Sequence, residues 1–274
     1  MKHNIKITLI VLALFLLAQS IGLVIVNKYL TKELPFNIER PKLSEEFSYI
    51  QLFITILIIT AFAIFLTRIK SIIIWKIWFF ISVLFALLFA FAAFIPQTLA
   101  LLIALVLTFY KVLRPNIIIH NFTELFIYGG LAGIFVPIFT IKTVFFLLIL
   151  ISVYDMIAVW KTKHMIKLAK FQSKLKIFAG LLVPYSLQKL KLKTKKAVKT
   201  KIAILGGGDI GFTLIFAGVV MKSTGFTLEA FITPVIVTLA LALLLFKGKK
   251  NKFYPAMPFL SIGCLVGYLI TLLI

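Results

Sequence analysis

Nine apolar stretches divide this chain of 274 residues. Each is close to the roughly 20 residues that a helix needs to cross the hydrocarbon core of a bilayer. Hydrophobic residues make up 62% of the sequence, whereas soluble domains typically contain about 45–50%. The sequence therefore predicts an all-α polytopic membrane protein with nine transmembrane helices. The expected spans cover residues 7–26, 47–67, 72–95, 97–113, 117–140, 143–160, 202–221, 227–246 and 253–274.

Two features of these spans do not follow from apolar length alone: the division of one long run, and the retention of the first span. The uncharged run from 77 to 110 is too long for one helix, and Pro96-Gln97 predicts a tight turn within it. The first apolar run is longer than the core of a usual signal peptide, so we expect a retained helix. The spans then predict an N-terminal six-helix part at 1–160, a basic cytoplasmic or interfacial loop at 161–201, and a C-terminal three-helix part at 202–274.

The basic residues determine the expected orientation. Lys and Arg number 30 against 8 acids, and most lie at the N-terminus and in the loops after spans two, four, six and eight. Because cytoplasmic loops are enriched in Lys and Arg, we expect a multi-pass cell-membrane protein with a cytoplasmic N-terminus and an extracytoplasmic C-terminus. This topology explains the net charge of +22 without nucleic acid. The alternation of Lys with apolar residues in 161–201 suits either contact with anionic lipid headgroups or a solvated loop.

The chain contains only two aspartates, Asp155 and Asp209, and each is the single formal charge in its predicted span. An ionisable side chain inside the membrane is costly and therefore indicates function. Counted along helices from Lys161 and Lys201, the two carboxyl groups lie roughly 9 and 12 Å from the basic boundary. They share nearly the same depth, so they can face each other if spans six and seven pack together.

Two carboxyl groups that share an apolar site cannot both ionise easily, so one proton is held between them. Aspartic proteases use this arrangement: the ionised carboxyl takes a proton from water while the protonated one polarises the scissile carbonyl. The adjacent Gly206-Gly207-Gly208 favours close approach of a substrate backbone or of a neighbouring helix. A proton- or cation-coupled transporter or channel would also need acids at this depth, and it is the alternative function. A catalytically silent membrane scaffold is a third possibility.

The segment KIAILGGGDIG at 201–211 also resembles a dinucleotide-binding turn, because a β-like run precedes glycines in the G-x-G-x-x-G pattern. The residues that follow are apolar and continue into another predicted span, so no parallel sheet is expected. Asp209 would moreover repel a pyrophosphate at that position. The sequence thus argues against a nucleotide site.

Three short motifs, each in the order and span expected, carry a resemblance to a known family. Tyr154-Asp155 in span six, Gly206-Gly207-Gly208-Asp209 in span seven and Pro255-Ala256-Met257 in span nine resemble the YD, GxGD and PAL motifs of the presenilin and signal peptide peptidase family. This family comprises GxGD intramembrane aspartyl proteases with nine spans. The resemblance implies that Asp155 and Asp209 are catalytic and that Tyr154 shapes the site. It also implies that Pro255, Ala256 and Met257 help to position substrate, although Met257 stands where the family has Leu.

The same resemblance implies a compact microbial homologue that cleaves peptide bonds within transmembrane segments. The expected orientation matches that of presenilin, so the expected substrates are single-span proteins with their N-termini outside. The short 161–201 segment puts internal maturation by cleavage in doubt. We expect no obligatory partner subunit, and a homo-oligomer is compatible with the sequence.

The remaining polar residues give weaker indications. His120 and Glu124 have the i, i+4 spacing of two metal ligands, but a third ligand is not nearby, so a polar helix terminus or a hydrogen bond between helices is the better interpretation. We expect no metal site and no cofactor. The small-residue pairs Gly129/Gly133 and Gly263/Gly267 predict close helix packing, and Cys264 is expected to be a buried apolar residue.

Overall fold

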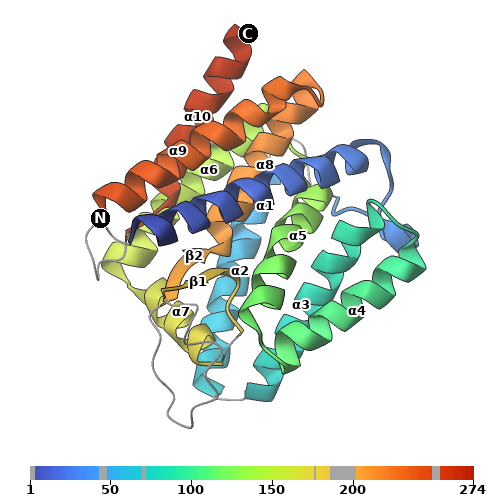
Figure 1. Ribbon diagram of the computed structural model, residues 1–274, viewed down its shortest axis with the longest axis vertical. Coiled ribbons are helices and arrows are strands. Elements are labelled where there is room, and N and C mark those ends of the chain that lie inside the picture. Colours follow the sequence, from blue (N-terminus) through green and yellow to red (C-terminus); the bar gives the residue numbers. More distant parts are fainter. Residues whose placement is uncertain (1–3, 43–47, 70–71, 176, 186–201, 249–253) are drawn as a thin grey trace.

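The computed structural model describes residues 4–42, 48–69, 72–175, 177–185, 202–248 and 254–274 (Figure 1). This part of the chain folds into an assembly of helices with one β-hairpin. The elements are α1 (Ile5–Thr31), α2 (Ser48–Ile69), α3 (Ile72–Ala92), α4 (Gln97–Leu113), α5 (Ile117–Phe135), α6 (Ile141–Met156), α7 (His164–Leu175), β1 (Gly180–Pro184), β2 (Ile202–Gly206), α8 (Gly207–Thr224), α9 (Ile232–Lys247) and α10 (Met257–Leu273). Short helical turns lie at Pro35–Asn37, Ile157–Lys161 and Leu228–Phe231.

Every predicted span contains a helix, and among the described residues six helical segments are long and apolar enough to cross a bilayer. These six are α1, α2, α3, α5, α6 with the following π turn, and α9 with the preceding short turn. Helices α4 and α10 are apolar but shorter. The membrane-helix class is therefore supported by the structure, while the count of nine crossings remains a prediction. The split at Pro96-Gln97 is confirmed, since α3 ends at Ala92 and α4 begins at Gln97.

The prediction of an all-α fold is wrong at one place, where β1 and β2 pair as an antiparallel hairpin with Gly180 opposite Gly206. The seventh predicted span consequently begins as a strand at Ile202, and its helix starts only at Gly207. The physical reason is pairing at a distance, because each strand satisfies its backbone with a partner that lies about 20 residues away along the chain. The predicted loop at 161–201 likewise holds α7 and β1, and its residues 186–201 lie outside the described residues.

Helix α1 runs along α5 across the face seen in Figure 1, and glycines allow this close contact. A Cβ atom added at Gly129 would come 2.6 Å from Ile25 Cδ1, and one added at Gly133 would come 2.6 Å from the Tyr29 ring. Between α9 and α10, a Cβ at Gly267 would lie 2.8 Å from the Thr233 backbone of α9. The predicted role of these glycines in close helix packing is confirmed.

Apolar side chains also cover much of the outer surface of the bundle. On α2, for example, Ile58 is 63% exposed and Phe65 is 55% exposed. Exposed apolar surface on this scale is unfavourable in water and is expected where lipid is the solvent. The interior is apolar too, and Cys264 is fully buried there, as predicted.

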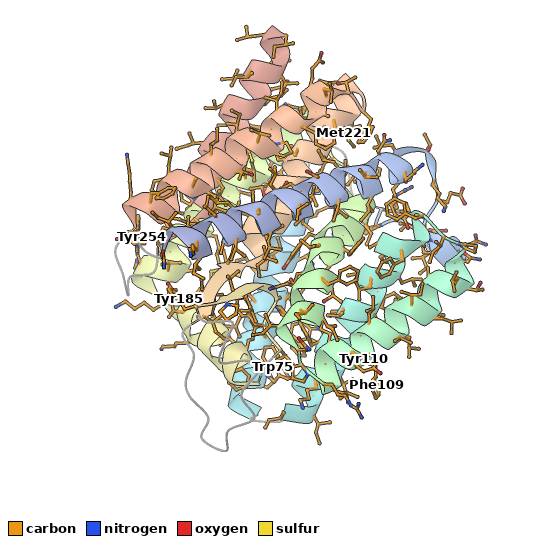
Figure 2. The ribbon with its side chains drawn as sticks, viewed as in Figure 1. Trp75, Phe109, Tyr110, Tyr185, Met221 and Tyr254 are labelled. Atoms are coloured by element: carbon orange, nitrogen blue, oxygen red, sulfur yellow. The ribbon has the colours of Figure 1, made fainter. Side chains whose placement is uncertain are left out.

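Helix α7 packs at one end of the bundle against α2 and α3. The Phe171 ring lies 5.4 Å from the Trp75 ring between centroids, and Trp75 is buried together with Ala63, Leu66 and Ile177 (Figure 2). This cluster connects the segment after α6 to the first half of the chain.

The closest helix contact yields a stability prediction at Gly130. A Cβ atom there would lie 2.0 Å from the Ala86 carbonyl oxygen, which belongs to the backbone of α3 and cannot rotate away. We expect Gly130→Ala to lower the free energy of unfolding in detergent by about 1–3 kcal/mol, measured from thermal or denaturant unfolding. Gly211→Ala is the matched control, since a Cβ there meets its nearest atom at an ordinary 3.6 Å. Equal stability of the two variants would contradict the packing argument.

Candidate active site

Asp155 lies in the last turn of α6 and is 5% exposed. This is the end of span six that is predicted to lie near the cytoplasm. The backbone N–H of Met257, the first residue of α10, donates a hydrogen bond to its Oδ2 at 3.1 Å. One turn away, the Ser152 and Ser261 hydroxyl groups are 2.8 Å apart and join the same two helices. The carboxyl group is therefore held between α6 and the start of α10.

Asp209 is the third residue of α8 and lies in the first turn of that helix. The partial positive charge at a helix N-terminus favours a carboxylate in this position. The Thr213 hydroxyl donates to the Asp209 carbonyl at 2.7 Å, and the Gln19 amide of α1 donates to the Thr213 hydroxyl at 2.8 Å and to the Ile210 carbonyl at 3.0 Å. These contacts hold the first turn of α8 against α1.

The segment that precedes Asp209 is a strand, Ile202–Gly206, and not a helix. A strand rises about 3.3 Å per residue, more than twice the rise of a helix. The roughly 12 Å counted from Lys201 along a helix is therefore wrong. Asp209 is brought to the site by β2, which continues directly into α8 (Figure 1). The β-like run of the nucleotide-like segment is thus a real strand, but in the described part of the chain it pairs only with β1 in a two-stranded antiparallel sheet.

A cavity of about 1860 Å³ brings the two aspartates together in one space. Helices α6 and α8 pack against each other, and Asp155 and Asp209 both line this cavity. It is also lined by Gly206, Gly207, Gly208 and Ala256. Two of the tyrosines that line the cavity, Tyr185 and Tyr254, lie on the same side of the view in Figure 2. The cavity is largely apolar and is large enough to admit an extended peptide segment.

The other residues of the predicted site do not all line this cavity. Met257 and Pro255 are buried, and Met257 contacts Asp155 through its backbone. Tyr154 is not among the residues that line the cavity; its hydroxyl lies 2.9 Å from His164 Nε2 of α7, and its ring meets Phe53 edge-on. The structure therefore places both aspartates, the three glycines and Ala256 on the wall of one cavity, while the Tyr154 side chain points to α7.

Sequence reasoning missed a buried polar cluster beside the cavity. The Lys111 ammonium lies 2.7 Å from Glu124 Oε1, and both side chains are almost completely buried. The Tyr128 hydroxyl donates to Glu124 Oε2, and Glu124 and Tyr128 both line the cavity. The signal in the sequence is Lys111, a basic residue that falls inside the predicted span 97–113.

His120 and Glu124 both contact the β-hairpin, a partner that the sequence does not predict, and Glu124 also makes a hydrogen bond between helices with Lys111 of α4. His120 Nε2 lies 2.7 Å from the Gly180 carbonyl oxygen, and the Gly180 N–H donates to Glu124 Oε2 at 2.9 Å. Among the described residues, no group of three His, Cys, Asp or Glu side chains is arranged to hold a metal ion.

An apolar helical bundle with both aspartates and Glu124 on one cavity defines a polytopic membrane protein with an acidic site. The chain belongs to the family described as signal-peptide peptidase, presenilin aspartyl protease, which matches residues 12–274. The resemblance of the three short motifs to this family is thereby confirmed. The family and the structural neighbours indicate an intramembrane aspartyl protease located in a membrane as a multi-pass protein. They give no support to a transporter.

Two solved structures show the same fold. A presenilin family intramembrane aspartate protease in the C222 space group is 22% identical, with a TM-score of 0.66, and the match covers 97% of this chain and 98% of that chain. A presenilin family intramembrane aspartate protease in the P2 space group is also 22% identical, with a TM-score of 0.68 over 98% of this chain and 97% of that chain. A comparison with curated protein sequences found no significant match.

The contact of His164 with Tyr154 yields a prediction about titration. Burial lowers the pKa of His164 below its ordinary value of 6.5. The imidazole is therefore neutral at pH 7, and its contribution to stability is complete above 6.5 and declines as the pH falls further. NMR of labelled histidine in detergent should show a midpoint below 6.5, assigned with His164→Asn among the three histidines of the chain. A midpoint at or above 6.5 would contradict the burial argument.

Proposed function

We propose that Asp155 and Asp209 are the catalytic pair of an endopeptidase that hydrolyses peptide bonds within transmembrane segments. The observation that carries this proposal is that the only two aspartates of the chain line one cavity inside the apolar bundle. Their positions match the YD and GxGD motifs of the family to which the chain belongs.

In the proposed reaction the pair shares one proton, and its two titrations belong to the pair as a whole. The ionised carboxyl takes a proton from a water molecule as the water oxygen attacks the scissile carbonyl carbon. The protonated carboxyl donates a hydrogen bond to the carbonyl oxygen, where negative charge develops. When the tetrahedral intermediate collapses, the C–N bond breaks and the leaving nitrogen receives a proton, so that a free amine and a carboxylic acid are formed.

The surrounding backbone would place the substrate for this attack. Gly206, Gly207 and Gly208 line the cavity without side chains, so an extended substrate segment can approach their peptide groups. Pro255 and Ala256 lead into α10, which begins at Met257, and the Met257 N–H would fix the direction of the Asp155 carboxyl group. Tyr154 would act less directly, by holding the end of α6 to α7 through His164.

The proposed topology has nine crossings with the N-terminus in the cytoplasm. It rests on the nine apolar segments and on the distribution of Lys and Arg. In this orientation the proposed substrates are single-span proteins whose N-termini lie outside. We propose that the chain acts in the bilayer without an obligatory partner subunit, alone or as a homo-oligomer.

Cleavage by the purified protein tests the catalytic proposal. The wild type in detergent should cut a single-span substrate within its span, as located by mass spectrometry. Asp155→Asn and Asp209→Asn should each lower the rate by about 100-fold or more, because each removes one acid or base of the pair. Glu229→Gln is the matched control, since it neutralises an acid that does not line the cavity, and it should retain wild-type activity. An intact substrate with a natively folded wild type would refute the proposal.

Labelling of introduced cysteines tests the topology. In a Cys264→Ala background, Ser223→Cys lies in the last turn of α8 on the predicted outer side, and Lys247→Cys lies at the end of α9 on the predicted cytoplasmic side. Both positions are exposed. A membrane-impermeant maleimide applied to intact cells should label only Ser223→Cys, and permeabilisation should expose both. The reverse pattern would show the opposite orientation.

A further inference from the structure

The buried cluster of Lys111, Glu124 and Tyr128 has no part in the proposed reaction, although it lies beside the cavity. Lys111 of α4 and Glu124 of α5 are 2% and 1% exposed, and their charged groups are 2.7 Å apart. The Lys111 ammonium also donates to the Thr123 hydroxyl at 2.9 Å. A buried ion pair is often no more stabilising than an apolar pair of the same volume, so stability alone does not account for it.

The Glu124 carboxylate connects this ion pair to the hairpin. Its Oε1 atom accepts from Lys111, while its Oε2 atom accepts from the Tyr128 hydroxyl and from the Gly180 N–H at 2.9 Å. The opposite side of Gly180 is also held, because its carbonyl oxygen lies 2.7 Å from His120 Nε2. Gly180 has a φ of +140°, and a Cβ atom there would lie 2.2 Å from the Leu205 carbonyl oxygen, so only glycine fits between α5 and β2.

A second contact from α5 fixes the strand at its middle. The Asn121 amide donates to the Leu182 carbonyl at 2.8 Å, and its carbonyl oxygen accepts from the Leu182 N–H at 2.9 Å. One side chain thus satisfies both backbone groups of Leu182. Since a strand can slip along its partner, contacts at two positions on β1 define the register of the hairpin.

The hairpin connects these contacts on β1 to the start of α8, which carries Asp209. Gly180 pairs with Gly206, and the Gly207 N–H donates to the Ala179 carbonyl at 3.2 Å. The Tyr128 ring also packs on the same turn, because a Cβ atom at Gly207 would lie 2.6 Å from the Tyr128 hydroxyl oxygen. Asp209 follows two residues later in the first turn of α8.

The geometry points to Asn121, Glu124 and Tyr128 as positioning residues that set the hairpin and the first turn of α8, and thereby direct Asp209 into the cavity. Lys111 supports them by neutralising Glu124. This inference rests on the proposed function, since it assigns these residues a part in the same reaction. None of them is assigned contact with the reacting atoms.

Tyrosine hydroxyl groups offer a matched kinetic test. Tyr128→Phe removes the hydroxyl that binds Glu124, and Tyr29→Phe removes an equally buried hydroxyl that donates to the Phe89 carbonyl at 2.6 Å, away from the hairpin. With a single-span substrate, Tyr128→Phe should lower kcat by about tenfold or more and change KM by less than about twofold, because the catalytic group is displaced while substrate contacts persist. Tyr29→Phe should change neither constant by more than about twofold. An unchanged kcat in Tyr128→Phe, or an equal loss in Tyr29→Phe, would overturn the inference.

Hydrogen exchange provides a readout that does not depend on proteolysis. Asn121→Ala removes both hydrogen bonds to Leu182, so peptides that cover 180–184 should exchange about fivefold faster or more in detergent, while Tyr29→Phe leaves them unchanged. Unchanged exchange in Asn121→Ala would overturn the inference even if the wild type is an active protease. A wild type that does not cleave, with faster exchange in Asn121→Ala, would instead refute the proposed function and leave the positioning of the hairpin supported.

Discussion

The Glu124 carboxylate accepts three hydrogen bonds. The donors are the Lys111 ammonium of α4, the Tyr128 hydroxyl of its own helix α5, and the Gly180 N–H of β1. A carboxylate among apolar helices is stable only when such partners surround it. The contacts place the hairpin against α5, and the hairpin leads into the helix that carries Asp209. The position of the candidate site thus depends on how this one buried charge is satisfied.

The two aspartates show other ways to hold an acid in an apolar interior. Asp155 accepts the backbone N–H of Met257 at the beginning of α10, where the first N–H groups of the helix have no partner within it. Asp209 lies in the first turn of α8, where the helix dipole favours negative charge. Both devices use helix ends, so α6 ends, and α8 and α10 begin, beside the two aspartates.

The residues of the candidate site were readable from the sequence to different degrees. Asp155 and Asp209 stood out because an acid inside an apolar run is rare, and a local pattern is enough to find it. The pairing of β1 with β2 was missed because it joins segments far apart in the chain, and no local periodicity reveals the partner. Lys111 does not stand out in the sequence, since its location at a span end resembles that of any basic residue at a membrane boundary.

By itself, the sequence determined the membrane class, the location of the helices, the two acids and their motifs, because these follow from composition and from short spacings along one chain. Only the tertiary structure decided that β2 precedes α8, that Tyr154 turns toward α7, and that Glu124 connects α4 and α5 to the hairpin. The physical reason is that buried polar groups must find partners, and the partners available depend on which helices pack side by side.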